Sequence, residues 1–167
     1  GATRSNIAAL DAVTGNATPW NPDAKSFVRA VTVSGNIVYA GGNFESIGGA
    51  SRHRIAALDA TTGTATPWDP CANGDVHALV VSGDAVYAAG RFDSIGGATR
   101  NHIAALAADT GVATAWNPNA NTYVNTLGVS GDTIYAGGEF SFIGGATRNY
   151  IAALDASTGA ANPWDPD

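Results

Sequence analysis

The sequence predicts an all-β repeat protein, and three observations carry this prediction. The tetrapeptide Ile-Ala-Ala-Leu recurs at a constant step of 48 residues, beginning at Ile7, Ile55, Ile103 and Ile151. Glycine accounts for 21 of the 167 residues and charged residues for only 13%, a composition typical of a turn-rich β-protein. No stretch shows the apolar period of an amphipathic helix.

Each repeat contains four short β-compatible runs, which we call runs A to D. In the second complete repeat they are residues 76–81 (A), 85–90 (B), 103–106 (C) and run D, which ends at Trp116. Ser82-Gly83-Asp84 separates A from B, and its glycine permits the positive φ of a tight hairpin turn. A Gly-rich connection joins B to C, and residues 107–111 turn the chain from C into D. Asn117-Pro118 ends the repeat.

These repeats predict a β-propeller, in which four-stranded antiparallel blades pack face to face around a central axis. The runs are apolar on both faces, so each small sheet must be covered on two sides. A parallel β-helix is the main alternative, but the tight A–B and C–D turns require antiparallel neighbours. We expect one repeat domain over residues 1–167 with three and a half blades of 48 residues. Its parts are a half blade of strands C and D at 1–20 and blades at 27–69, 75–117 and 123–165.

Two motifs resemble known propeller families. The segment Tyr39-Ala40-Gly41-Gly42, which recurs at 135–138 and is followed later by a tryptophan, resembles kelch-type repeats. The segment 57–63, followed by Trp68, resembles the tryptophan-docking motif of quinoprotein-like propellers. Similar repeats belong to bacterial secreted or surface proteins. The resemblance therefore implies a propeller fold and a secreted or cell-surface location, and it implies a fold more than an activity.

The most strictly repeated large side chains are expected to be structural. We interpret the tryptophans as wedges between blades, because an indole buries on the order of 200 Å²; a platform for a stacked sugar is the alternative. The arginines are expected to bind loop carbonyls or Asp69 and Asp165 near the corner that follows each tryptophan. The two sets are Trp20, Trp68, Trp116 and Trp164, and Arg4, Arg52, Arg100 and Arg148.

Aspartates begin three of the C–D turns, at Asp11, Asp59 and Asp155. A short carboxylate at this position accepts backbone N–H groups, and the glycine that ends the turn supplies a positive φ. A calcium site is the alternative. The equivalent position of another repeat is Ala107, and that repeat continues in register, so a turn role is favoured.

Composition and motifs argue against several classes of function. A net charge of −6 with eight scattered Lys and Arg residues disfavours nucleic acids and anionic membrane surfaces as partners. No apolar run approaches the roughly 18 residues that a membrane span needs. His53, His77 and His102 occupy three different repeat positions without metal-ligand spacing, and no nucleophile elbow or P-loop occurs. We therefore predict no catalytic residue, metal or cofactor, and an accessible free thiol at Cys71.

The positions at which the repeats differ are the candidates for binding, because packing does not fix them. They cluster in the D-to-A and B-to-C connections, which alternating strand direction puts on one face of a propeller. This face mixes aromatic, amide and singly charged side chains, which suits a polar ligand such as a glycan or a protein surface; drift of solvated loops is the alternative. The candidates are Lys25, Phe27, Glu45, Asp75, His77, Arg91, Tyr123, Asn125 and Glu139.

The sequence thus predicts a non-enzymatic propeller module for binding or assembly. One alternative is a fragment of a larger propeller enzyme of quinoprotein or galactose-oxidase type, with its active site elsewhere. Another is a structural repeat that forms a filament or lattice. Even a ring of about four blades needs more than the 167 residues given, and the missing part is an A–B pair. We therefore expect either association with other copies or completion by further blades of a longer chain.

Overall fold

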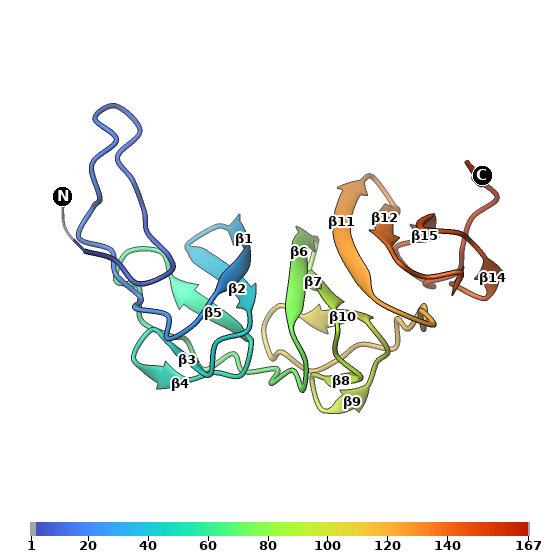
Figure 1. Ribbon diagram of the computed structural model, residues 1–167, viewed down its shortest axis with the longest axis horizontal. Helices are drawn as coiled ribbons and strands as arrows, with labels where there is room; N and C mark the ends of the chain where they lie inside the picture. The colour runs from blue at the N-terminus through green and yellow to red at the C-terminus, as the bar shows by residue number, and fades with distance from the viewer. Residues whose placement is uncertain (1–2, 167) are drawn as a thin grey trace.

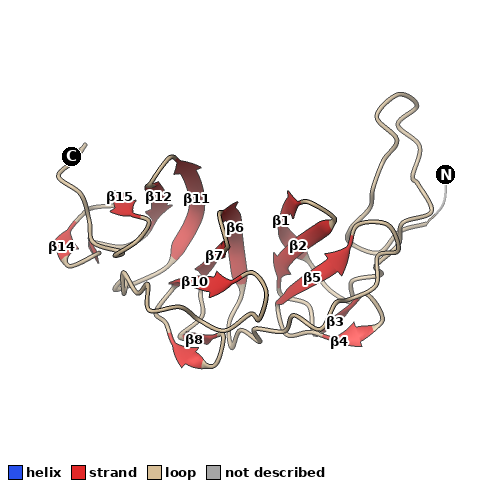
Figure 2. Ribbon diagram, turned by 180° about the vertical axis from the view of Figure 1, so that it is seen from behind, coloured by secondary structure: helices blue, strands red, loops and turns tan. Residues whose placement is uncertain are grey.

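The computed structural model describes residues 3–166, in which three blades follow one another in an arc (Figure 1). Each blade holds a three-stranded antiparallel sheet formed by runs A, B and C. The strands are β1 (Val28–Ser34), β2 (Ile37–Gly42) and β5 (Ile55–Asp59); β6 (Val76–Ser82), β7 (Ala85–Gly90) and β10 (Ile103–Ala107); β11 (Val124–Ser130), β12 (Thr133–Gly138) and β15 (Ile151–Asp155). Strands and loops make up the described chain (Figure 2), and the prediction of an all-β repeat is confirmed.

Glycines shape the hairpin of runs A and B. In the second blade, Gly83 takes a φ of 56° in the turn between β6 and β7, as its sequence position predicts. At the other end of the hairpin, Val76 pairs with Gly90 but Ala78 pairs with Ala89, so β6 carries one extra residue there. Such a bulge bends the strand and brings its backbone over Gly90.

Run D is less regular than predicted. In the second blade it joins the sheet through one isolated antiparallel bridge, Leu106 to Ala113, and the same bridge recurs in the other blades. The ladder ends there because the chain turns away to carry Trp116 to the next blade. The fourth strand of each predicted blade is therefore a short extension of a three-stranded sheet.

The Gly-rich B-to-C connection, which is predicted to be a loop, contains a short hairpin. In the second blade Gly96 and Gly97 close it with φ values of 62° and 76°, which glycine adopts without strain. The paired strands are β3 (Ser46–Ile47) and β4 (Ala50–Ser51), β8 (Ser94–Ile95) and β9 (Ala98–Thr99), and β13 (Phe142–Ile143) and β14 (Ala146–Thr147).

The sequence predicts a half blade at the N-terminus, and the structure forms only part of it. Among residues 3–20 the Leu10–Ala17 bridge is the one β pairing, and this segment projects beyond the first sheet (Figure 1). Ile7 and Trp20 are nevertheless buried against the first blade. Run C forms no ladder here because the described residues 3–166 place no A–B pair beside it to supply hydrogen bonds.

Tryptophans join consecutive blades. The Trp68 indole N–H donates to the Ala107 carbonyl of the next blade at 2.9 Å, and its ring meets the edge of Tyr39 at 5.1 Å. Trp20 and Trp116 make the same bond to the blade that follows each of them, to the Asp59 carbonyl at 3.1 Å and to the Asp155 carbonyl at 2.9 Å. These three rings are only 8, 5 and 4% exposed, so they hold the interfaces between blades and leave no free face for a stacked sugar.

Arginines fix run D beside the B-to-C hairpin. The Arg52 guanidinium donates to the Thr66 carbonyl at 2.5 Å and lies 3.6 Å from the Asp69 carboxylate. Arg148 makes the equivalent bond to the Asn162 carbonyl and reaches Asp165 at 3.2 Å. Arg4 and Arg100 also donate to the carbonyl at this position. The arginines therefore lie on loop carbonyls and corner aspartates.

The turn aspartates accept several hydrogen bonds each. At Asp155, the hydroxyls of Ser157 and Thr158 and the amides of both residues donate to one carboxylate oxygen. These bonds favour the charged carboxylate and hold the pKa of Asp155 at about 2, below its usual 3.8. The same kind of bonds, chiefly from Thr14 and Thr62, lower the pKa of Asp11 and Asp59.

The hydrogen bonds to Asp155 make the free energy of unfolding depend on pH. Because the folded pKa of Asp155 lies below the unfolded value, its contribution is complete above about pH 4 and is lost as the pH falls towards 2. We expect Asp155→Ala to lower the free energy of unfolding at pH 7 and to make its decrease below pH 4 shallower than in the wild type. Urea unfolding at a series of pH values measures both effects. The control is Asp109→Ala, since no hydrogen bond to the Asp109 carboxylate occurs within residues 3–166; equal pH dependence in all three proteins would contradict the prediction.

Candidate functional site

The D-to-A and B-to-C connections meet on one face of the arc, as predicted, and we call this surface the loop face. In each blade a backbone amide of the B-to-C connection donates to a carbonyl of the D-to-A connection. In the second blade, the Arg91 amide donates to the Asp75 carbonyl at 2.8 Å. These bonds bring side chains that are distant in sequence to neighbouring positions. The loop face consists of residues 23–27, 43–45, 71–75, 91–93, 119–123 and 139–141, together with the side chains that contact them.

An ionic cluster lies between the first and second blades. The Asp75 carboxylate of the second blade lies 3.6 Å from Arg29 and 4.0 Å from Arg54, both of the first. Arg54 also pairs with Glu45 at 3.0 Å. Glu45 and Asp75 are thus brought together through Arg54, and because the pairs are partly exposed each contributes little to stability.

An aromatic cluster lies between the second and third blades. The Arg91 guanidinium stacks over the Tyr123 ring at 4.6 Å, and the His102 ring meets Tyr123 edge-on at 5.3 Å. Burial lowers the pKa of His102, partly offset by the Asp93 carboxylate, so the imidazole is neutral at pH 7. A cation over an aromatic ring and a neutral imidazole can together bind a flat polar group.

A polar row continues on β6 and β11, the run A strands of the second and third blades. His77 on β6 meets the Asn125 side-chain oxygen on β11 at 3.0 Å, and Asn125 donates to Glu139 at 3.3 Å. Lys25 and Phe27 lie apart from it in the first blade. Lys25 pairs with the neighbouring Asp23 at 2.5 Å, and the Phe27 ring, 64% exposed, lies 5.9 Å from the Arg29 guanidinium.

Sequence reasoning missed four residues of this face as ligand candidates, namely Arg29, His53, Arg54 and His102. The signal that finds them was present, since each position holds different residues in the different repeats. Arg54 and His102 also take φ values of 66° and 65°, a left-handed conformation that is unusual for these residue types. Within residues 3–166 no group of three or more His, Cys, Asp or Glu side chains is placed to hold a metal ion.

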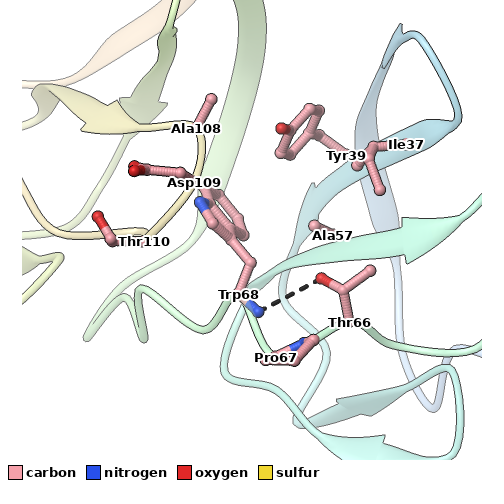
Figure 3. A pocket seen from close by; sticks show the side chains of 9 residues that line it. All are labelled: Ile37, Tyr39, Ala57, Thr66, Pro67, Trp68, Ala108, Asp109 and Thr110. Carbon is pink, nitrogen blue, oxygen red and sulfur yellow. Dashed lines mark hydrogen bonds between the residues drawn. The ribbon is translucent and has the colours of Figure 1, made fainter.

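Apart from the loop face, a cavity of about 490 Å³ lies at the interface between the first two blades, beside the C–D turn of the second blade (Figure 3). The Trp68 indole stands between Tyr39 on one side and Asp109 on the other. Since the indole N–H already donates to a backbone carbonyl, Asp109 is the charged group that this cavity offers. The cavity belongs to the blade interface and contains none of the predicted ligand residues.

No protein-family model matches the sequence, and no curated protein sequence matches it either. Solved structures do match. The computationally designed Ika8 protein has a TM-score of 0.60 and 18% identity, over 96% of this chain and 43% of its own. The designed Ika4 protein has a TM-score of 0.56 and 19% identity, over 86% of this chain and 74% of its own. BamB from Moraxella catarrhalis has a TM-score of 0.55 and 23% identity, over 85% of this chain and 37% of its own.

These neighbours establish the fold. BamB is a β-propeller and the designed proteins are propellers too, so the prediction of an all-β, propeller-like fold of about three repeats is confirmed. The chain spans less than half the length of Ika8 and of BamB. In residues 3–166 no helix has the length and hydrophobicity to cross a membrane.

Proposed function

We propose that this protein is a non-enzymatic β-propeller module that assembles through its end blades and presents its loop face to a polar ligand. The observation that supports assembly is the exposure of Trp164. This tryptophan is 44% exposed, whereas its three counterparts are buried. Its ring contacts Tyr135 at 5.7 Å, but no acceptor for its indole N–H lies within residues 3–166. Within residues 3–166, Trp164 therefore has no following blade to pack against.

The other end of the arc offers a complementary surface. Val31 on β1 is 52% exposed, while the equivalent Leu79 on β6, which the preceding blade covers, is 7% exposed. An apolar groove of about 310 Å³ lies there, between the half blade and β1. In the repeat, Asp11 holds the position of Asp59, whose carbonyl accepts the indole of Trp20. The half blade of a second copy therefore supplies the carbonyl that Trp164 lacks.

Self-association is tested by size-exclusion chromatography with light scattering. At micromolar concentration we expect a mass that is a multiple of 16.8 kDa. Trp164→Ala should return the monomer mass, because the indole provides the largest apolar contact of that end. The matched control is Val112→Ala, which removes an exposed apolar side chain from the middle blade and should leave the mass unchanged.

Two results would count against self-association. A wild-type mass of 16.8 kDa would overturn it and favour completion by further blades of a longer chain, to which the greater lengths of Ika8 and BamB point. A multiple mass that Trp164→Ala leaves unchanged would place the contact elsewhere.

The loop face is proposed to bind a glycan or a protein. The Tyr123 cluster supports this, since it combines a partly exposed aromatic ring, an exposed guanidinium and a neutral imidazole. A glycan array and NMR titration with the sugars that bind test the proposal. Binding should weaken in Tyr123→Ala and persist in Tyr150→Ala, which removes an exposed tyrosine outside this cluster. Binding that survives Tyr123→Ala would move the site away from the cluster.

We also propose that the repeats are of the tryptophan-docking, quinoprotein-like type. The support is that the indole N–H of each buried tryptophan donates to a backbone carbonyl of the next blade. The tryptophan that makes this contact is the one that belongs to the motif resembling tryptophan docking.

A further inference from the structure

We propose that Cys71 is an activated thiol that exchanges with small disulfides, with His53 as its base and Glu45 as the residue that orients His53. The three side chains form a chain of contacts on the loop face. The Cys71 sulfur lies 3.3 Å from Nδ1 of His53, and Nε2 of the same ring lies 3.2 Å from the Glu45 carboxylate. This order of nucleophile, base and orienting acid is the arrangement that activates nucleophiles in enzymes.

The carboxylate decides which imidazole nitrogen carries the proton. An ionised carboxylate only accepts hydrogen bonds, so a neutral His53 must place its N–H on Nε2, which faces Glu45. Nδ1 then keeps its lone pair, and this nitrogen faces the Cys71 thiol. The geometry thus gives the sulfur a proton acceptor at hydrogen-bond distance.

Arg54 and a backbone hydrogen bond link the segments that carry these side chains, of which His53 is 44% and Glu45 60% exposed. Arg54 pairs with the Glu45 carboxylate at 3.0 Å and donates to the Ala72 carbonyl at 3.0 Å. The amide of Ala72 in turn donates to the His53 carbonyl at 3.1 Å, which ties the two segments together. The thiol is exposed, as the sequence predicts, and lines a cavity of about 540 Å³ beside the β8–β9 hairpin. A small disulfide therefore has room to approach the sulfur.

The fold places a polar side chain beside the position of Cys71 in other repeats too, but only here is one of the two side chains a thiol. At the equivalent positions of the next repeat, Asn101 donates to Asn119 at 2.8 Å. In the half blade the Ser5 and Asp23 side chains are hydrogen-bonded to each other. The backbone therefore holds two polar side chains together at this corner, and here they are an imidazole and a thiol.

The proposed step is a thiol–disulfide exchange. As the Cys71 sulfur attacks one sulfur of the disulfide, its proton passes to Nδ1 of His53. A new sulfur–sulfur bond forms, the original one breaks, and the departing thiolate takes the proton from the imidazolium. The products are a mixed disulfide on Cys71 and one free small thiol, and the incoming disulfide is the only oxidant required.

The test uses 2,2′-dithiodipyridine, a neutral disulfide whose exchange is followed by the absorbance of the released thione. At pH 7 we expect the wild type to react about ten-fold faster than His53→Asn, with Glu45→Ser between them. Both substitutions introduce residues found at the same positions of other repeats, Asn101 and Ser141, so the fold accepts them. The pH profile of the wild-type rate should differ from that of His53→Asn, because only the wild type carries a base beside the thiol.

A thiol in the neighbouring repeat gives the matched control. Asn119→Cys in a Cys71→Asn background places the sulfur on the equivalent backbone, beside Asn101 instead of a histidine. Its rate should equal that of His53→Asn. Equal rates and equal pH profiles in the wild type, His53→Asn and this control would overturn the proposal and leave Cys71 an ordinary surface thiol.

Discussion

Replacement of Trp68 by alanine is expected to lower the free energy of unfolding by about 3–5 kcal/mol, a large share of what a single domain has. The indole is 5% exposed and packs with Val76 and Phe92 of the following blade in the core between the two sheets. Its removal leaves a cavity at this interface and takes the indole N–H from the Ala107 carbonyl, which keeps the Gly111 amide as a donor.

Urea unfolding followed by circular dichroism measures the loss. Trp164→Ala is the matched control, since it removes the same side chain at the open end of the arc, where the ring is 44% exposed. At concentrations low enough to prevent association it should cost less than about 1 kcal/mol. Similar losses in the two variants would show that the indoles contribute through their own blade alone and not through the contact between blades.

Gly90→Ala is expected to destabilise the second blade by about 3 kcal/mol or more. A Cβ at this position would lie 2.0 Å from the Asp75 carbonyl oxygen and 3.0 Å from Val76 Cα. Both neighbours are backbone, and Asp75 O also accepts the Arg91 amide, so the bulge cannot relax without losing that bond. The φ of Gly90 is not in the left-handed region, and the cost arises from the close approach of two strands.

Gly137→Ala is the control for this prediction. Its Cβ would meet the Thr126 methyl group at 2.7 Å, which is a side-chain contact, and Ala89 holds the equivalent position of the second blade. We expect a loss of less than about 1 kcal/mol in thermal and urea unfolding. A stable Gly90→Ala protein with unchanged unfolding would show that the strands separate at the bulge without cost.

The repeated blade was predictable because its signals are local. Gly83 fixes the A–B turn, and runs that are apolar on both faces require sheets covered on two sides, so the positions of β6, β7 and β10 follow from the sequence. Run D was predicted as a full strand, but its pairing stops at the Leu106–Ala113 bridge. The pairing ends because Trp116 packs against the next blade, where its indole N–H donates to the Asp155 carbonyl, 39 residues further along the chain.

For the candidate site, the sequence by itself determined which connections vary and that they share a face, because strands of alternating direction put them at the same edge. Only the tertiary structure decided which side chains touch. Arg91 reaches Tyr123 and His77 reaches Asn125 across blade interfaces, and His53 meets Cys71 through a corner held by backbone bonds. A repeat pattern predicts the backbone of each blade and the tryptophan wedges between blades, but not which of the variable side chains pair between blades, because those distances depend on how neighbouring sheets pack.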